Sequence, residues 1–324
     1  MTGSDAQTTT RVGAVFVPQL PPERLKSVAQ AADEAGLDEL WLWEDCFLES
    51  GITTAVAALA WTQRLTVGVG LLPVPLRNVA ITAMELATVH RLFPGRARIA
   101  VGHGVQDWMG QVGARAESPL TLLREHLTAL RSLLSGRRVT SSGRYVKLDG
   151  VALDWPPPRM PELLSGATGD HTLRLAGELA DGTILTGGST VAQVRRARGL
   201  IDEGRARAGR TDPHRIVVYL HCATGPDAAS RMEAERVRWG YDTMDGHGVA
   251  GGAEAVAEAV RAWAAAGADT VVLQPTPDDP DPEGFMAFAA QEVTPWSTTD
   301  HGPAGPGRGP ASGCLRGVDR EFVS

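Results

Sequence analysis

The distribution of apolar and polar residues along the chain alternates between short buried strands and amphipathic helices. Residues 65–72 form an apolar run bounded by a proline, which is typical of a strand buried on both faces. Residues 79–92 repeat apolar side chains at helical spacing, and Pro94-Gly95 ends this helix. Residues 97–102 form a second buried strand. Two strands joined by a helix in this way are expected to lie parallel in one sheet, because parallel neighbours need a crossover connection.

The same rhythm continues along the chain. Strands are expected at residues 11–17, 40–43, 65–72, 97–102, 162–165, 182–186, 215–222 and 269–274. Helices are expected between and after them, at residues 23–35, 54–62, 79–92, 119–135, 171–180, 190–208, 227–239, 253–266 and 282–292. Eight strands that alternate with helices predict an α/β fold, a (β/α)8 TIM barrel with insertion segments at the C-terminal rim. A doubly wound sheet in two domains is the alternative, but no linker divides the chain before residue 297.

The pattern also predicts the domain boundaries. Residues 1–10 are small and polar, residues 11–296 carry the barrel, and residues 297–324 are rich in Gly and Pro without periodicity, so both ends are expected to be disordered. Within the barrel, the long segment 105–160 and the loop 242–252 are expected to cover the site and to set its specificity.

Composition narrows the function class. The 324 residues include 43% hydrophobic side chains, enough for a substantial core. The net charge of −7, without basic blocks, disfavours nucleic acid as a partner. Three widely spaced cysteines give neither a disulfide framework nor a zinc pattern. Because neither a signal peptide nor a membrane-spanning run is recognisable, the chain is expected to be a soluble cytoplasmic protein without a membrane partner.

In a barrel of this kind the active site lies in the loops that follow the strands. The loop Gly166-Ala167-Thr168-Gly169-Asp170 joins a strand to a helix start. Its backbone N–H groups and the helix dipole predict an anion site, with glycines that allow close approach of a phosphate. An ordinary turn, capped by Thr168 or Asp170, is the alternative.

Other rim side chains could take part in chemistry. His103, between two glycines, could donate a hydrogen bond or a proton, or could be a loop histidine without such a role. Glu44 and Asp45 are adjacent on a strand end and should face opposite ways, so one could bind a ligand while the other caps the next segment. Arg77 could hold a phosphate or pair with a rim acid. Cys46 has no recognisable base and is expected to be a small buried residue.

Common cofactor motifs are missing from the sequence. No Walker motif, metalloprotease motif or complete Gly-x-Gly-x-x-Gly motif occurs, because residue 107 is Asp where the third glycine would stand after Gly102-His103-Gly104. The residues alone therefore predict a barrel enzyme that binds a phosphate-bearing ligand, without a metal.

A set of short motifs, in a fixed order over residues 11–296, resembles the bacterial luciferase-like superfamily. These motifs are Gly68-Val69-Gly70-Leu71-Leu72-Pro73, Arg77-Asn78, Phe93-Pro94-Gly95-Arg96, Ala100-Val101-Gly102-His103-Gly104, Leu122-Leu123-Arg124-Glu125, Gly136-Arg137-Arg138-Val139-Thr140, Gly143-Arg144-Tyr145 and Ala176-Gly177-Glu178-Leu179-Ala180-Asp181-Gly182. Within the superfamily the chain is most similar to the branch that depends on coenzyme F420, a deazaflavin, and FMN-dependent monooxygenases are the close alternative.

The resemblance implies where the cofactor would bind. The ring would lie at the barrel mouth against Gly70-Leu71, where the family often has a non-proline cis peptide, and close to Gly104. The phosphate would lie at the loop that runs from Gly166 through Ala167, Thr168 and Gly169 to Asp170. His103, Asp45 and Glu44 are the candidate catalytic residues.

Two departures from the family pattern bear on the reaction. Asp45 stands where many members have a histidine, and Val105 replaces a glutamate of the sugar-phosphate dehydrogenases, which argues against glucose 6-phosphate. Three functions remain open: an F420-dependent hydride transfer to or from a small organic substrate, an FMN-dependent monooxygenase, and a cofactor-free member without catalysis. Trp108, Trp155 and Trp239 favour a partly apolar substrate, and the resemblance implies a homodimer.

Overall fold

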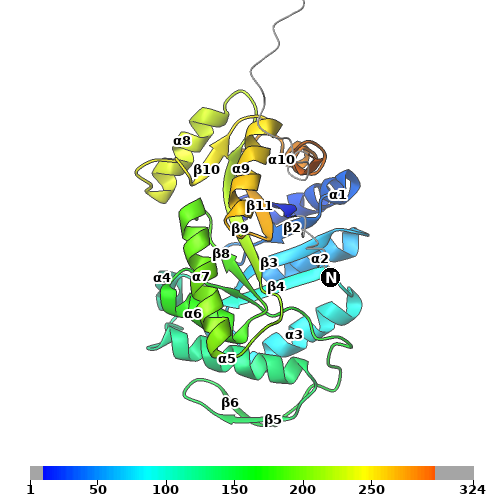
Figure 1. Cartoon of the computed structure of the whole chain (residues 1–324). Coiled ribbons are helices and arrows are strands. Elements are labelled where there is room, and N and C mark those ends of the chain that lie inside the picture. Colours follow the sequence, from blue (N-terminus) through cyan, green and yellow to red (C-terminus); the bar gives the residue numbers. More distant parts are fainter. Residues whose placement is uncertain (1–9, 296–324) are drawn as a thin grey trace, which may run out of the picture.

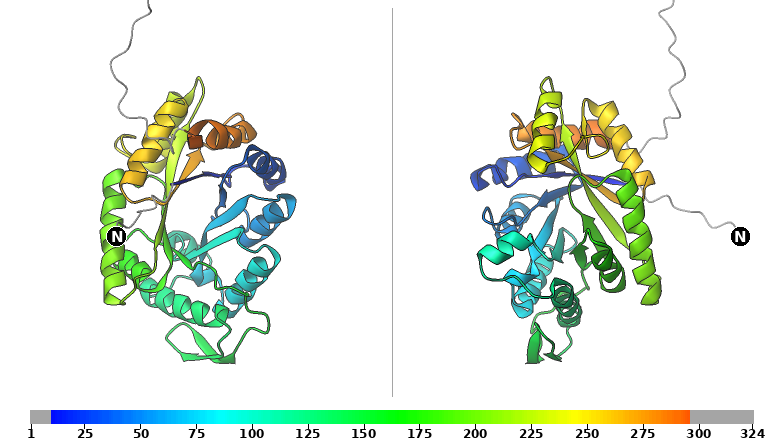
Figure 2. Two further views of the ribbon diagram at one scale, coloured as in Figure 1. Left: turned by 45° about the vertical axis from the view of Figure 1, so that its right-hand side comes forward. Right: turned by 90° about the vertical axis from the view of Figure 1, so that its left-hand side faces the viewer.

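The computed structural model describes residues 10–295. Eight parallel strands close into a barrel, since β8 pairs with β9 in addition to the linear strand order. The left view of Figure 2 shows the strands around a common axis, with the helices outside them (Figures 1 and 2). The barrel strands are β1 (Arg11–Val15), β2 (Glu39–Leu42), β3 (Thr66–Pro73), β4 (Ala97–Gly102), β7 (Leu164–Gly166), β8 (Gly182–Leu185), β9 (Arg215–Ala223) and β11 (Thr270–Pro275).

This architecture confirms the predicted (β/α)8 barrel and rules out the doubly wound sheet in two domains. Each predicted strand lies within a few residues of an observed one. The segments predicted to be disordered are residues 1–10 and 297–324, and all of these residues except Thr10 lie outside the described ones. Within residues 10–295, no helix combines the length and the apolar character needed to cross a bilayer.

The helices occur at the predicted places, with two additions and one shift. They are α1 (Leu25–Ala35), α2 (Gly51–Trp61), α3 (Val79–Leu92), α4 (Gln106–Gln111), α5 (Pro119–Leu134), α6 (Asp170–Leu179), α7 (Val191–Arg207), α8 (Ala228–Trp239), α9 (Ala253–Ala265) and α10 (Pro282–Ala287), with short turns η1 (Pro22–Arg24), η2 (Val74–Leu76) and the wide turn η3 (Phe288–Val293). The helices α4 and η2 were not predicted. Helix α2 begins at Gly51, earlier than expected, because the Glu44 carboxylate accepts the Gly51 N–H at 2.8 Å and orders the first turn.

The insertion segments differ from expectation in their placement. Segment 139–151 forms the antiparallel hairpin of β5 (Val139–Ser142) and β6 (Lys147–Val151). Glu125 of α5 accepts the N–H groups of Tyr145 and Val146, so the hairpin packs on the outer side of α5. It lies at the opposite end of the molecule from α8 (Figure 1), which corrects the expectation that all of 105–160 covers the site. The expected loop 242–252 contains β10 (Gly248–Ala250), which extends the sheet beside β9.

The core has two layers. A large cluster fills the space between the strands and the helices, and a smaller one fills the barrel itself. The smaller cluster is dominated by Trp41, Trp43 and Tyr219, whose rings meet edge to face. Gly68 makes room for the Trp41 ring, because a Cβ atom at residue 68 would lie 2.4 Å from it. Small and large inward-facing residues thus interlock, and the barrel interior is a packed core.

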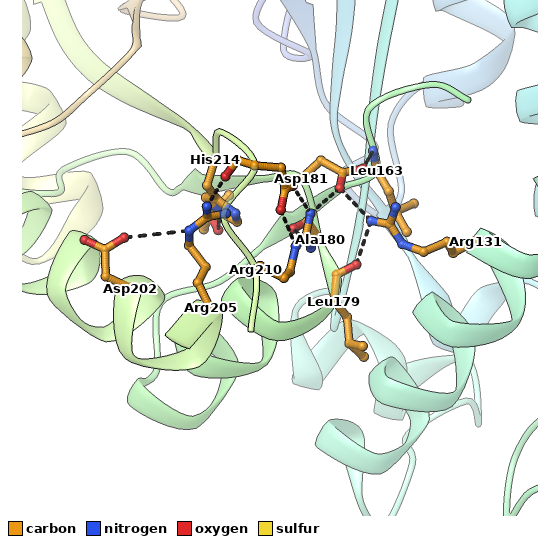
Figure 3. A network of polar contacts seen from close by, with 11 residues as sticks. Arg131, Leu163, Leu179, Ala180, Asp181, Asp202, Arg205, Arg210 and His214 are labelled. Carbon is orange, nitrogen blue, oxygen red and sulfur yellow. Dashed lines mark hydrogen bonds and ion pairs between the residues drawn. The ribbon is translucent and has the colours of Figure 1, made fainter. Parts of the chain in front are cut away.

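Partly buried ion pairs stabilise the base of the barrel. Asp181, before β8, accepts hydrogen bonds from Arg131 Nη2 at 2.7 Å, Arg210 Nη2 at 2.6 Å and the Leu163 N–H at 2.9 Å (Figure 3). Burial alone would raise the pKa of Asp181, but these three hydrogen bonds hold it below its usual value. This carboxylate therefore joins α5, β7 and the segment before β9, at the strand ends opposite the barrel mouth.

We expect Asp181→Asn to lower the free energy of unfolding by about 2–3 kcal/mol at pH 7, because two partly buried guanidinium groups lose their charged partner. Because the folded-state pKa is lowered, the wild-type advantage is present above the unfolded pKa of about 4 and is lost as the pH falls through the folded value. Urea unfolding of the wild-type protein and the variant at pH 7 and at pH 3 measures the loss of free energy of unfolding and its dependence on pH. The exposed Asp154→Asn is the control, and an equal loss for Asp181→Asn at both pH values would contradict this account.

Candidate active site

A cavity of about 770 Å³ lies at the barrel mouth, where the carboxyl ends of the parallel strands meet. Most of the predicted site residues line it, namely Glu44, Asp45, Gly70, Leu71, His103, Gly104, Gly166, Ala167 and Thr168. Gly169 and Asp170 are not among its lining residues. Among the described residues, no group of three His, Cys, Asp or Glu side chains is placed to hold a metal ion.

The backbone of β3 bulges into this cavity. The Gly70–Leu71 peptide bond is cis, as the resemblance implied, and the pairing of β3 with β4 shifts register between Val69 and Leu72. The Leu71 side chain fits between two glycines of neighbouring strands, since a Cβ atom would lie 2.5 Å from Leu71 Cδ2 at Gly102 and 2.1 Å from it at Gly166. We call Gly102 and Gly166 the glycine socket. The space at these two glycines, on β4 and β7, accommodates the Leu71 side chain and so positions the bulge of β3.

Two buried hydrogen-bond donors lie under the bulge. A Cβ atom at Gly70 would lie 2.1 Å from the Tyr219 hydroxyl oxygen, so the glycine leaves that hydroxyl uncovered. Tyr219 Oη and Trp43 Nε1 are both buried, both residues line the cavity, and apart from each other the two groups have no hydrogen-bond partner within the described part of the chain. Burial raises the pKa of Tyr219, which keeps the phenol protonated and able to donate. A ligand with polar edges would satisfy these donors.

Glu44 is tied to the scaffold. Its Oε2 accepts a hydrogen bond from Arg77 Nη2 at 2.9 Å and another from the Gly51 N–H at 2.8 Å. Burial raises the pKa of Glu44, and the Arg77 charge opposes this rise. The structure thus supports the alternative in which Arg77 pairs with a rim acid, and it leaves Glu44 a weaker candidate for proton transfer than Asp45.

Asp45 is the acid whose charge state is most adjustable. Burial raises its pKa to about 6, so the carboxyl group exchanges its proton close to neutral pH. Glu49 nearby is raised to a pKa of about 7 by burial and by the Asp45 charge. Cys46, expected to be a buried residue, is only partly buried. Desolvation and the charges of Glu44 and Asp45 raise the pKa of its thiol, which disfavours the reactive thiolate.

His103 is half-buried on the loop after β4. Its Nε2 lies 3.1 Å from Thr172 Oγ1 on α6, and its buried Nδ1 has no partner among residues 10–295. Burial lowers the pKa of His103, so the ring is neutral at pH 7 and can hydrogen-bond a ligand without carrying charge. Gly104 follows with a φ of 66°, and a Cβ atom there would lie 2.9 Å from Pro73 Cβ, which explains the need for glycine.

The predicted anion loop offers backbone N–H groups, and its acidic side chain turns away. Gly169 is the N-cap residue of α6 and no side chain caps the helix, so neither Thr168 nor Asp170 is the cap, and the anion site stays a prediction. The Asp170 carboxylate pairs with Arg196 of α7 at 2.5 Å, which corrects the expectation that the whole loop faces the cofactor. Gly166, Ala167 and Thr168 face the cavity, and the first N–H groups of α6 remain available to an anion.

Part of the cavity lay outside the sequence prediction. Tyr219, Glu235, Arg238 and Tyr241 line it, on β9, on α8 and just after α8. Tyr219 stands two residues before His221 on β9, and side chains two residues apart on a strand lie on the same face. Once this strand is placed in a barrel, both side chains are therefore expected to face inward.

We expect Asp45→Asn to raise the free energy of unfolding at pH 7 by about 1–2 kcal/mol. The folded-state pKa of about 6 exceeds the unfolded value, so the stability contributed by protonated Asp45 is present below the unfolded value and lost as the pH rises through 6. The gain should accordingly vanish near pH 4. Thermal unfolding at pH 4 and pH 7 measures it, with the exposed Asp149→Asn as control. A loss of stability at pH 7 would show that Asp45 is a paired, stabilising carboxylate.

Known proteins resemble this chain in sequence. A reductase of Methanolobus tindarius, 5,10-methylenetetrahydromethanopterin reductase, is 31% identical over 228 residues, which cover 69% of this chain and 69% of the relative. An F420-dependent glucose-6-phosphate dehydrogenase of Microbacterium testaceum is 27% identical, covering 67% and 69% of the two chains.

Solved structures share the fold. An F420-dependent secondary alcohol dehydrogenase with an F420–acetone adduct superposes with a TM-score of 0.80 at 20% identity, covering 89% of this chain and 99% of the other. The FMN-bound oxygenating constituent of 3,6-diketocamphane monooxygenase from Pseudomonas putida superposes with a TM-score of 0.74 at 18% identity, covering 89% and 98%. The family model described as luciferase-like monooxygenase matches residues 3–242. This match spans most of the chain, and the chain therefore belongs to the luciferase-like monooxygenase family.

Proposed function

We propose that this protein is an oxidoreductase that binds coenzyme F420 at the barrel mouth and transfers a hydride between the deazaflavin and a small organic substrate. The observation that carries the choice of cofactor is the sequence match to F420-dependent relatives over two thirds of the chain. The FMN-bound neighbour supports the fold of the second candidate, a flavin-dependent monooxygenase, at lower identity.

The residues present fit such a cofactor. The bulge at Gly70-Leu71 offers a backbone ledge for a flat ring, and the buried donors of Trp43 and Tyr219 face the cavity with no described partner apart from each other. The N–H groups at the start of α6, next to Thr168, offer an anion site for a phosphate without needing a lysine. Bound there, the deazaflavin would supply or accept the hydride.

The protein's own contribution is position and a proton. The ledge and the glycine socket fix where a ring and a substrate can meet, which makes the reaction effectively unimolecular. Asp45, with its pKa of about 6, can hold a proton at its carboxyl group and exchange it with a substrate oxygen. His103 is a neutral hydrogen-bonding partner in this scheme, and Glu44 keeps the first turn of α2 in place.

Titration of the purified protein with F420 and with FMN, followed by fluorescence, tests this proposal. We expect F420 to bind at least about tenfold more tightly than FMN, a difference of about 1.4 kcal/mol.

Gly70→Ala should weaken F420 binding about tenfold, because its Cβ atom would meet the Tyr219 hydroxyl and push the ledge out of place. In the double variant with Tyr219→Phe part of the affinity should return, since the nearest remaining atoms, Ile184 Cδ1 and Cζ of residue 219, are 3.1 Å and 3.3 Å away.

Gly199→Ala is the matched control, because nothing lies within 4 Å of a Cβ atom at this position on α7. Tighter binding of FMN would favour the monooxygenase and redirect the search to oxygen chemistry. Binding of neither compound would favour a cofactor-free member of the family.

We also propose that the protein works as a homodimer in the cytoplasm. Exposed apolar side chains on α2 and α3 support an interface there, since Ile81 and Met84 are 49% and 54% exposed and Trp61 is 38% exposed. Size-exclusion chromatography with light scattering should give twice the chain mass of 34.3 kDa. Ile81→Lys should shift the protein toward the monomer, and an unchanged monomeric mass for both proteins would contradict the homodimer.

A further inference from the structure

The cavity has two walls of different character. The cofactor residues proposed above belong to the loops after β2, β3, β4 and β7. The opposite wall is built by the ends of β8 and β11 and by the segment from α8 to Tyr241. We call this the substrate wall, and its residues are Thr186, Gly187, Trp239, Tyr241, Gln274 and Pro277. It is the part of the cavity left for a substrate once the ledge is occupied.

Gln274 gives the substrate wall a buried polar group without a partner. It lies on β11 in register with His221 of β9 and is only 4% exposed. Its Oε1 atom has no hydrogen-bond partner among the described residues, although the residue lines the cavity. A Cβ atom at Gly187 would lie 2.8 Å from this oxygen, so glycine leaves it uncovered. A buried acceptor of this kind is costly unless a ligand donates to it, and a hydroxyl group is such a donor.

The substrate wall also contains two aromatic rings, those of Trp239 and Tyr241, whose orientation is fixed by neighbouring side chains. Trp239 donates its Nε1–H to Glu235 at 2.9 Å. The Tyr241 ring stacks on His247 with centroids 4.3 Å apart and an interplanar angle of 9°. His247 Nδ1 in turn lies 2.6 Å from the Gly188 carbonyl oxygen and so donates to it. Rings fixed in this way favour a ligand with a flat ring, since little side-chain entropy is lost on contact.

Charges in the cavity disfavour an anionic substrate. Arg238 is the only lysine or arginine among the described residues that line it, and its Nε lies 3.3 Å from the buried Glu235 carboxylate. Its charge is therefore already balanced. When Asp45 is ionised, its carboxylate on the facing wall would repel a carboxylate or phosphate placed against the substrate wall. The relatives named for glucose 6-phosphate act on an anion, and the residues of the substrate wall include no lysine or arginine to hold one.

We propose that the substrate wall binds an uncharged compound with a flat ring and a hydroxyl group, the ring against Trp239 and Tyr241 and the hydroxyl donating to Gln274 Oε1. This inference rests on the proposed function for the identity of the opposite wall, but its binding test does not depend on turnover.

Three probes of one ring system test the proposal: 1-(2-naphthyl)ethanol, the hydrocarbon 2-ethylnaphthalene and the anion 2-naphthylacetate. Each is titrated by calorimetry or by ligand-detected NMR, with and without F420. We expect the alcohol to bind about tenfold more tightly than either of the other two probes. In Gln274→Leu the preference for the alcohol over the hydrocarbon should disappear, while the free energy of unfolding stays equal or rises, because an unpaired buried oxygen has been removed.

Two further variants separate ring contact from charge. Trp239→Ala should weaken the binding of the alcohol and the binding of the hydrocarbon about equally, by about tenfold. Trp155→Ala, at a side chain that is 72% exposed beyond the cavity, should change nothing. Glu235→Gln removes the negative charge that balances Arg238. The affinity for 2-naphthylacetate should therefore rise several-fold relative to the affinity for the alcohol.

The proposal is overturned if the anion binds as tightly as the alcohol to the wild-type protein, if none of the three probes binds, or if Gln274→Leu retains the preference for the hydroxyl group. Failure of F420 to bind would overturn the proposed function. The probe titrations without cofactor would still test whether the substrate wall binds an uncharged ring with a hydroxyl group.

Discussion

The packing of Leu71 into the glycine socket is the contact on which the barrel mouth depends. With Cβ atoms at Gly102 and Gly166, the Leu71 side chain would have to move away from its place beside the bulge of β3, because its Cδ2 methyl group would lie 2.5 Å from one and 2.1 Å from the other. The bulge in turn places Gly70 over the Tyr219 hydroxyl and exposes backbone to the cavity. Three neighbouring strands thus cooperate to make one ledge, and this ledge belongs to the wall that we propose for the cofactor, opposite the substrate wall.

Stability and chemistry are concentrated at opposite ends of the barrel. At the base, Glu39 is fully buried and accepts hydrogen bonds from Arg98 at 2.9 Å and from the Trp41 indole at 3.0 Å, and Asp181 is likewise paired. At the mouth, the buried Gln274 Oε1 has no partner among the described residues, the Tyr219 hydroxyl has none apart from Trp43, and the Asp45 pKa is raised. A scaffold fixed at its base can hold such unsatisfied groups at the mouth, where a ligand can meet them.

The fold could be predicted from the sequence because strand and helix periods alternate so regularly, and the ledge at Gly70-Leu71 because its motif resembles a known family. Side-chain contacts between neighbouring elements could not be predicted in this way. The pairing of Asp170 with Arg196 and the packing of the hairpin on α5 depend on how consecutive elements pack against each other, which the periodicity within each element does not show. Tyr219 was missed for a related reason: within an apolar strand its role follows from facing inward beside Gly70, which spacing along one strand does not show.

We propose that the deazaflavin ring lies against the Gly70-Leu71 ledge, on the wall of the cavity that faces the substrate wall, and a crystal structure of the F420 complex would show whether it does. We expect the ring against Gly70-Leu71, its phosphate at the start of α6, and open space between the ring and Gln274. A ring stacked on Trp239 or Tyr241, with the ledge facing solvent, would contradict it.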